Sequence, residues 1–243
     1  MKNIIVGSQK FFRKHKQTLK LRFNFTVNYL IQLFNLLSEF LPSKKVLIPL
    51  LNCLIIFSNC ADSKKNKLAD CAFAQGDIIF RQGTGIKSIA VLRADSAGLF
   101  SHVGILVKVD GAFKAVHLSP GEKRNNDTEE KVIMEEVSDF FAPGKARSGA
   151  IMRFVDSSEC GISAARYASK KYDEGLNFDH NYDLSDTTRM YCTEFVWHAY
   201  LQSGRDITQN RRSVVKGVTM FSEIFILPSD IYKNQKLQTI YKF

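Results

Sequence analysis

Residues 101–120 read SHVGILVKVDGAFKAVHLSP, and this stretch predicts a β-hairpin. The dipeptide Asp110-Gly111 lies at its centre, and a two-residue type I′ turn needs residues that tolerate positive φ at both central positions. Branched apolar residues occupy alternate positions of the first arm, at Val103, Ile105, Val107 and Val109. Such alternation predicts that one face of the strand packs into a hydrophobic core.

The register of this hairpin brings two histidines to its other face. Pairing outward from the turn sets Val109 opposite Ala112 and Gly104 opposite His117. His102 and His117 are then diagonal neighbours, with backbones about 7–8 Å apart, which imidazole side chains can bridge. Gly104 lies between them and leaves room for another group to approach closely.

The segment YCTEFVWHAY at residues 191–200 predicts a helix that begins near Cys192. Its apolar residues recur at helical spacing, at Phe195, Val196, Ala199 and Tyr200. A helix N-terminus favours negative charge, so we expect a lowered pKa for the Cys192 thiol. The same end offers unpaired backbone N–H groups that can stabilise an oxyanion. Glu194, two residues later, is expected to have a structural role.

Each of these residues also has a simpler interpretation. A single cysteine near a helix start is more often a small buried hydrophobe, and a single histidine is more often structural. The combination of Cys192 with two histidines on one face of a strand pair favours a nucleophile and its base.

Three short motifs resemble those of a known family. GDIIF at residues 76–80, SHVGILV at 101–107 and YCTEFV at 191–196 are similar to the permuted papain-like amidases of the YiiX/YaeF type, within the wider NlpC/P60 superfamily. The histidine precedes the cysteine here, as in the circularly permuted branch. The resemblance covers roughly residues 70–232 and implies a circularly permuted papain-like fold.

The resemblance also implies roles for individual residues. Cys192 matches the family's nucleophile and His102 matches its base. The third polar position holds His117, where YiiX-like members commonly have Glu, and a His-Leu pair here resembles the lecithin retinol acyltransferase-like branch. A histidine can orient the base but supplies no fixed negative charge. Tyr191 is expected either to line the substrate pocket or to pack in the core.

The basic composition belongs to the first part of the chain. The 243 residues carry a net charge of +10, with 34 Lys and Arg and 24 Asp and Glu. Residues 1–67 hold 12 of these basic residues and 2 of the acidic ones, so the remainder holds 22 of each. Because the remainder is neutral, no nucleic-acid partner is expected.

The leader, residues 1–67, predicts attachment to a membrane. Lys44-Lys45 precedes VLIPLLNCLIIFSNC, whose apolar run has the length of a secretory signal and is short for a spanning helix. The last four residues resemble a bacterial lipobox, which implies lipidation of Cys60. The apolar run 23–41 is either a membrane-lying segment or part of an over-long gene start. We therefore expect a lipoprotein or membrane-anchored protein of the bacterial cell envelope.

The cysteines and histidines give no sign of a cofactor. Five cysteines occur, at positions 53, 60, 71, 160 and 192. Loss of the first and lipidation of the second would leave three, which is no disulfide framework. We expect no metal and no cofactor, because neither a Cys/His spacing typical of zinc nor a phosphate-binding glycine motif occurs.

Residues 68–243 predict one α+β domain, an antiparallel sheet or half-barrel with the cysteine helix packed on it. Strands are expected at the hairpin and at 77–80, 132–137 and 150–154. Helices are expected within 83–94, near 157–172 and from Cys192, and residues 228–232 are expected to end the domain as a loop or a final strand.

These features together predict a cysteine hydrolase of the amidase or peptidase type. A Cys192–His102–His117 site would act through an acyl-enzyme on an amide or ester of the envelope, in a peptide, peptidoglycan or lipid. One alternative is a lipid acyltransferase or phospholipase of the lecithin retinol acyltransferase-like branch. Another is a catalytically inactive, membrane-tethered binding module. Substrate profiling distinguishes the amidase or peptidase from the lipid acyltransferase or phospholipase. The reactivity of the thiol distinguishes an enzyme from the binding module.

Overall fold

The computed structural model of the chain describes residues 68, 70–96, 98–122, 128–217 and 223–243. All of them belong to the second of two units of the chain, Ser63–Phe243. The leader with Cys60 lies outside the described residues. Across the part that is described, no helix combines the length and the apolar character needed to cross a membrane.

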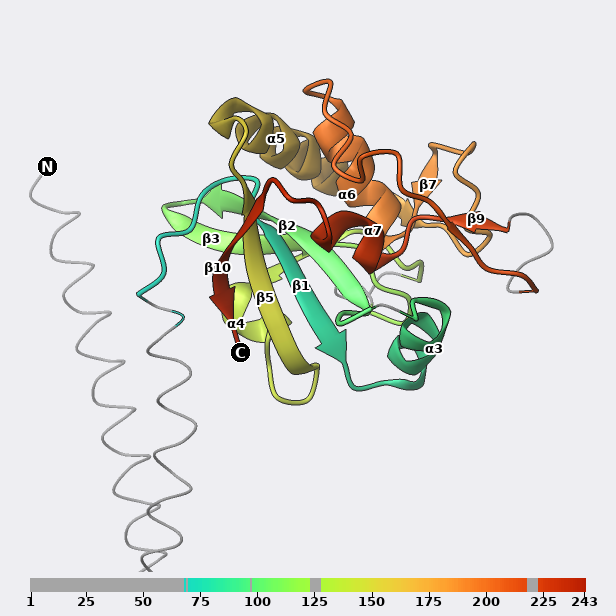
Figure 1. The fold of residues 1–243 in the computed structure, drawn as a ribbon. Helices are drawn as coiled ribbons and strands as arrows, with labels where there is room; N and C mark the ends of the chain where they lie inside the picture. Colours follow the sequence, from blue (N-terminus) through green and yellow to red (C-terminus); the bar gives the residue numbers. More distant parts are fainter. Residues whose placement is uncertain (1–67, 69, 97, 123–127, 218–222) are drawn as a thin grey trace, which may run out of the picture. The chain divides into compact units, whose positions relative to one another are not determined.

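Six strands form one antiparallel sheet in the order β10-β5-β1-β2-β3-β4 (Figure 1). Its strands are β1 (Ile78–Gly83), β2 (His102–Val109), β3 (Ala112–His117), β4 (Ile133–Glu136), β5 (Ala146–Phe154) and β10 (Leu237–Lys242). The helices are α3 (Ile86–Ala94), α4 (Val137–Phe140), α5 (Ser158–Glu174), α6 (Cys192–Leu201) and α7 (Pro228–Tyr232). Two short strand pairs complete the described part, β6 (Asn177–Phe178) with β7 (Arg189–Met190) and β8 (Ser213–Val214) with β9 (Ile224–Phe225).

The central hairpin, β2 and β3, has the predicted turn and register. Asp110 and Gly111 have φ of 51° and 86°, as a type I′ turn requires. Val109 pairs with Ala112, and Gly104 pairs with His117. The prediction of the hairpin from its turn residues is therefore confirmed.

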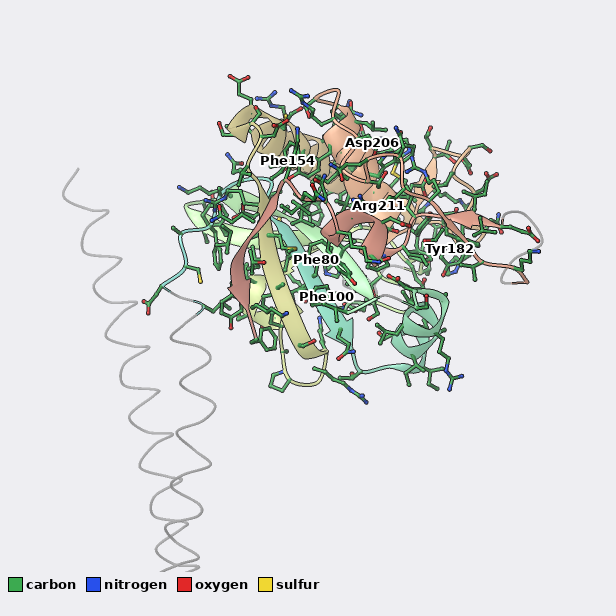
Figure 2. The ribbon with its side chains drawn as sticks, in the orientation of Figure 1. Phe80, Phe100, Phe154, Tyr182, Asp206 and Arg211 are labelled. Atoms are coloured by element: carbon green, nitrogen blue, oxygen red, sulfur yellow. The ribbon has the colours of Figure 1, made fainter. Side chains whose placement is uncertain are left out.

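The sheet separates two groups of buried side chains. On one face, the branched residues of β2 join Phe80 and the inner sides of α5 and α6, and this is the larger core (Figure 2). On the other face, Leu106 and Ala115 pack against Phe140 and Phe141 at α4. Complete burial of a large apolar side chain stabilises the fold by about 1.5–3 kcal/mol. The cysteine helix is thus packed on the sheet, as predicted.

The end of the domain differs from the prediction. Residues 228–232 form helix α7 instead of a loop or strand, and Pro228 occupies its first turn, where a missing N–H costs nothing. The final strand is β10, which pairs with β5 and was not predicted. The long strand β5 also begins at Ala146, four residues before the predicted start. Strand β10 is an edge strand with no fully buried residue, so its sequence lacks a clear apolar alternation.

Candidate active site

Cys192 is the first residue of α6, as the sequence predicts. The carboxylate of Glu194 accepts a hydrogen bond of 3.3 Å from the backbone N–H of Tyr191, which caps the helix and gives Glu194 its structural role. Backbone N–H groups of Val103, Thr193 and Cys192 itself lie near the sulfur and favour its ionised form. Because Val103 directly follows His102, the sulfur lies beside the start of β2.

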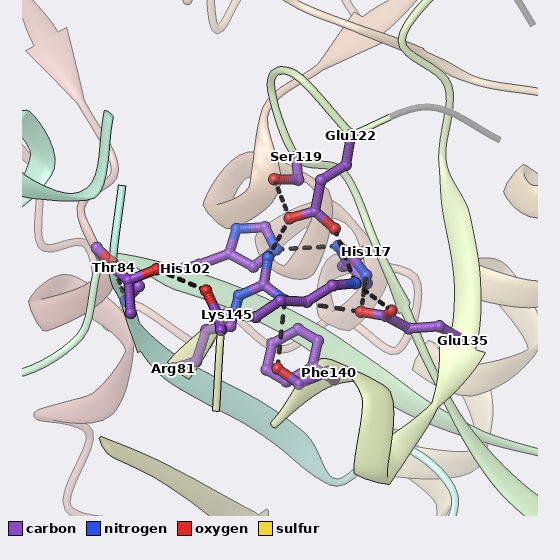
Figure 3. A network of polar contacts seen from close by, with 12 residues as sticks. Arg81, Thr84, His102, His117, Ser119, Glu122, Glu135, Phe140 and Lys145 are labelled. Atoms are coloured by element: carbon purple, nitrogen blue, oxygen red, sulfur yellow. Dashed lines mark hydrogen bonds and ion pairs between the residues drawn. The ribbon is translucent and has the colours of Figure 1, made fainter. Parts of the chain in front are cut away.

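His102 and His117 are in direct contact on one face of the hairpin (Figure 3). The distance between His102 Nε2 and His117 Nδ1 is 2.9 Å, and both side chains are buried. The ring of His102 also stacks on Phe140, with centroids 5.6 Å apart. A Cβ on Gly104 would lie 2.9 Å from the Cβ of His117, so the glycine makes room for the second histidine. The predicted pairing of the two imidazoles is confirmed.

A carboxylate that the sequence analysis missed lies behind His117. Glu135 Oε1 is 3.0 Å from His117 Nε2. The β3–β4 register sets Glu135 opposite Ala115, which places the carboxylate on the same face as both histidines. The strand at 132–137 was predicted, but its register was not, because residues 118–132 are too long a connection to specify pairing. The fixed negative charge that His117 lacks is therefore present one residue further along the network.

Two cations hold this carboxylate and a second one, Glu122 (Figure 3). Lys145 Nζ lies 2.6 Å from Glu135 Oε2 and 3.4 Å from Glu122 Oε2. Arg81 pairs with Glu122, lies 3.6 Å from Glu135 and stacks over the Phe140 ring at 4.5 Å. Burial opposes ionisation of Glu135, but the bonds from His117 and Lys145 outweigh it and lower its pKa to about 2. Glu135 is thus an anion at all physiological pH values.

Three side chains of this network also offer donor atoms for a metal ion. One donor atom each of His117, Glu122 and Glu135 lies within 4.8 Å of the others. Both carboxylates are already neutralised by Arg81 and Lys145, and a divalent cation would stand directly against these two charges. These three side chains therefore suit the charged groups of Arg81 and Lys145 better than a metal ion.

The pKa of the Cys192 thiol differs from expectation. Burial raises the pKa of Cys192 to about 11, although the three backbone N–H groups oppose the shift. Burial, reinforced by the charge of Arg81, lowers the pKa of His102 well below its usual value. The expected lowering of the thiol pKa at the helix N-terminus is therefore wrong, because removal from water outweighs the helix end. At neutral pH both groups are uncharged.

Cys192 and His102 line one cavity of about 550 Å³. Its walls come from the end of β1, from α3 and from the loops after β3 and α4, and Phe178 and Tyr182 face it beside the cysteine. Tyr191 is not among the lining residues. Its side chain is buried in the core and its hydroxyl accepts a hydrogen bond of 2.9 Å from Ile226 N. Of the two roles expected for Tyr191, lining the pocket and packing in the core, the structure shows the second.

Comparisons with known proteins identify the fold. No family model matches the chain, and no curated protein matches it. A solved structure described as "metalloprotein yiiX from Escherichia coli O157:H7, DUF1105" superposes with a TM-score of 0.55 at 20% sequence identity. The match covers 70% of this chain and 97% of that one. The chain therefore has a mixed α+β fold of the YiiX type, in agreement with the permuted papain-like architecture that its motifs predict.

Proposed function

We propose that this chain is a cysteine hydrolase that cleaves an amide or ester through an acyl-enzyme. The observation that carries the proposal is a line of hydrogen bonds from Glu135 through His117 to His102, which ends in the cavity that Cys192 also lines. A structural histidine pair needs neither a carboxylate hydrogen-bonded to it nor a thiol in the same cavity.

The line of hydrogen bonds assigns the proton on each imidazole. Ionised Glu135 only accepts, so His117 Nε2 carries a proton and donates it. His117 Nδ1 is then an acceptor, and the contact of 2.9 Å requires a proton on His102 Nε2. His102 Nδ1 is left with a lone pair, and no hydrogen bond among the described residues uses it. That nitrogen is the base in the proposed reaction.

The chemistry starts from an uncharged thiol and an uncharged imidazole. His102 Nδ1 takes the proton of Cys192 as the sulfur attacks the carbonyl carbon, and an S–C bond forms. The imidazolium then returns this proton to the leaving nitrogen or oxygen, and the C–N or C–O bond breaks. Water attacks the resulting thioester with His102 as base again, which releases the acid and regenerates the thiol.

Residues around the pair stabilise the charges that develop. The backbone N–H groups of Cys192 and Thr193, at the free end of α6, are donors for the oxyanion. Positive charge on His102 is stabilised through His117 by Glu135, in the way that a buried carboxylate supports an imidazolium in a catalytic triad. Lys145 and Arg81 hold Glu135 in place and keep it ionised.

The leader and the chemistry suggest the setting of the reaction. A secretory signal would direct the domain to the bacterial envelope, and a lipid on Cys60 would anchor it there. The substrate class is then an amide or ester of that compartment, in a peptide, peptidoglycan or lipid, and no nucleic acid takes part. These assignments rest on the sequence of residues 1–67.

The test is intact-mass analysis of the full-length protein after brief incubation with envelope extract and acid quenching. An added acyl mass that maps to Cys192, and that is absent from Cys192→Ala, is the expected result. The Cys160→Ala variant serves as the control and should carry the same adduct as the unaltered protein. A protein that never acquires an acyl group on Cys192, yet retains envelope material without change in mass, would instead be a binding module.

A further inference from the structure

Helix α3 is apolar in sequence but has no buried residue. It reads IKSIAVLRA, in which six of nine residues are apolar. The side chains of Ile86 and Ile89 are 87% and 42% exposed, and their i, i+3 spacing places them on the same face of the helix. In Figure 1 the helix lies beyond the carboxyl end of β1. An apolar helix that is left in water lacks the burial that normally stabilises helices, so a partner surface is indicated.

The composition of the exposed side of α3 indicates what that partner is. The exposed residues of the helix are Ile86, Lys87, Ile89, Ala90 and Arg93. The helix contains no acidic residue, and Lys87 and Arg93 give it a charge of +2. Isoleucine side chains can enter the headgroup region of a bilayer, and the cations beside them are attracted to anionic lipids.

The acid that directly follows α3 in the sequence does not cancel this charge at the surface. Asp95 follows the helix, but it is buried, and its carboxylate accepts a hydrogen bond of 2.9 Å from Ser229 N. Its side chain is thus directed toward α7. The exposed side of α3 is cationic and apolar along its whole length.

We propose that α3 docks on an anionic lipid surface. Four residues of the helix line the cavity that holds Cys192 and His102, and these are the exposed Ile86 and Lys87 and the half-buried Ser88 and Val91. Docking of the exposed side therefore brings the mouth of the cavity to the lipid–water interface. The docking surface does not depend on the proposed function, because α3 would contact lipid even if Cys192 formed no acyl-enzyme.

The chain offers a matched control for exposure alone. Ile162 on α5 is 43% exposed, nearly the same as Ile89 at 42%. Ile162 does not line the cavity of Cys192, and single exposed apolar residues of this kind are normal on soluble proteins. A lipid probe that only follows apolar exposure would therefore treat the two positions alike.

The experiment uses the full-length protein with phosphatidylglycerol vesicles that contain a trace of phosphatidylglycerol with a photoactivatable acyl chain. After irradiation, trypsin releases residues 88–93, which contain Ile89, and residues 154–166, which contain Ile162. We expect several-fold more lipid adduct on 88–93 than on 154–166, and a loss of this excess in Ile89→Asp. Because both peptides come from the same molecules, attachment through the leader cancels in the ratio.

Two further conditions make the result decisive. Ile162→Asp should leave the adduct on residues 88–93 unchanged, and phosphatidylcholine vesicles should lower it because the charge complement is gone. Equal labelling of the two peptides in phosphatidylglycerol vesicles would overturn the proposal. So would an excess that persists undiminished in Ile89→Asp, since the exposed side of the helix would then not be the contact.

Discussion

Two cysteines lie in the first turn of a helix, Cys192 in α6 and Cys160 in α5, and their thiol pKa values move in opposite directions. Burial raises both. At Cys160, hydrogen bonds with Ser203, Ser157 and Arg205 outweigh burial, and the pKa is lowered. At Cys192 the compensating donors are backbone N–H groups alone, and the pKa is raised to about 11.

The comparison shows that a low thiol pKa and access to the cavity of His102 are separate properties of a cysteine. Cys160, the more acidic thiol of the two, is buried in the core and does not line the cavity of His102. Cys192 is the less acidic thiol, but it shares a cavity with His102, the proposed base, whose Nδ1 has no hydrogen bond within the described part of the chain. A helix N-terminus near a cysteine therefore does not by itself mark a nucleophile. A place in the cavity and a histidine supported by a carboxylate are the features that favour Cys192 as the proposed nucleophile.

The largest expected effect separates the two cysteines directly. Cys192→Ala should lower the turnover of p-nitrophenyl acetate by about a thousandfold or more, because no other cysteine of the described residues lines the cavity of His102. Cys160→Ala should keep turnover while lowering the free energy of unfolding by about 1 kcal/mol, through loss of a buried side chain. A reversal of these two results, measured by release of p-nitrophenol, would exchange the roles of the cysteines.

The pH dependence of alkylation tests the raised pKa of Cys192. Below a pKa of about 11 the thiolate fraction rises about tenfold per pH unit, so labelling by iodoacetamide should increase roughly a thousandfold between pH 6 and 9. The rates are measured by peptide mass in the full-length protein. A plateau of the Cys192 rate near pH 7 would mean a preformed thiolate, contrary to an uncharged pair.

Removal of the base should have the next largest effect. His102→Ala should lower turnover by about a hundredfold or more, which is the usual contribution of general base catalysis. His117→Ala should lower it less, because His102 keeps its contact with Phe140 and its place in β2. Normal turnover in His102→Ala together with an inactive His117→Ala would assign the base to the other histidine.

Glu135→Gln should have the smallest effect of the series, about tenfold on turnover, because this residue acts through two imidazoles. The amide can donate to His117 Nε2, which would reverse the proton order and remove the lone pair from His102 Nδ1. Glu136→Gln is the matched control, since Glu136 is exposed and pairs with Lys114. If Glu135→Gln and Glu136→Gln had the same turnover and the same pH profile, Glu135 would not orient the histidines.

The sequence predicts the parts of the site that local chemistry specifies. Asp110-Gly111 determines the turn, the turn determines the register, and the register brings His102 to His117. The start of α6 at Cys192 follows from helical spacing of apolar residues. These inferences need only neighbours in the chain.

The rest of the site depends on pairings between distant segments. Glu135 meets His117 across β3 and β4, whose connection is long, and Arg81 comes from the distant strand β1. Lys145 is only ten residues from Glu135, but it meets the carboxylate only because the chain turns back after α4. The error in the thiol pKa has a related cause, because the extent of burial at Cys192 is a property of the packed domain. Successive side chains along the predicted strand 132–137 point to opposite faces of the sheet. This alternation was the one signal that could have placed the Glu135 carboxylate on the same face as His102 and His117.

The most direct test of the proposed proton transfer from Cys192 to His102 is to locate the residue that an activated ester acylates. The full-length protein is treated briefly with p-nitrophenyl acetate, and hydroxylamine-labile acetyl groups are located by peptide mass spectrometry. We expect an acetyl thioester on Cys192 in the unaltered protein and its loss in His102→Ala. Acetylation of Cys160 or Cys71 with Cys192 unmodified, or an acetyl group on Cys192 that forms equally fast in His102→Ala, would contradict this expectation.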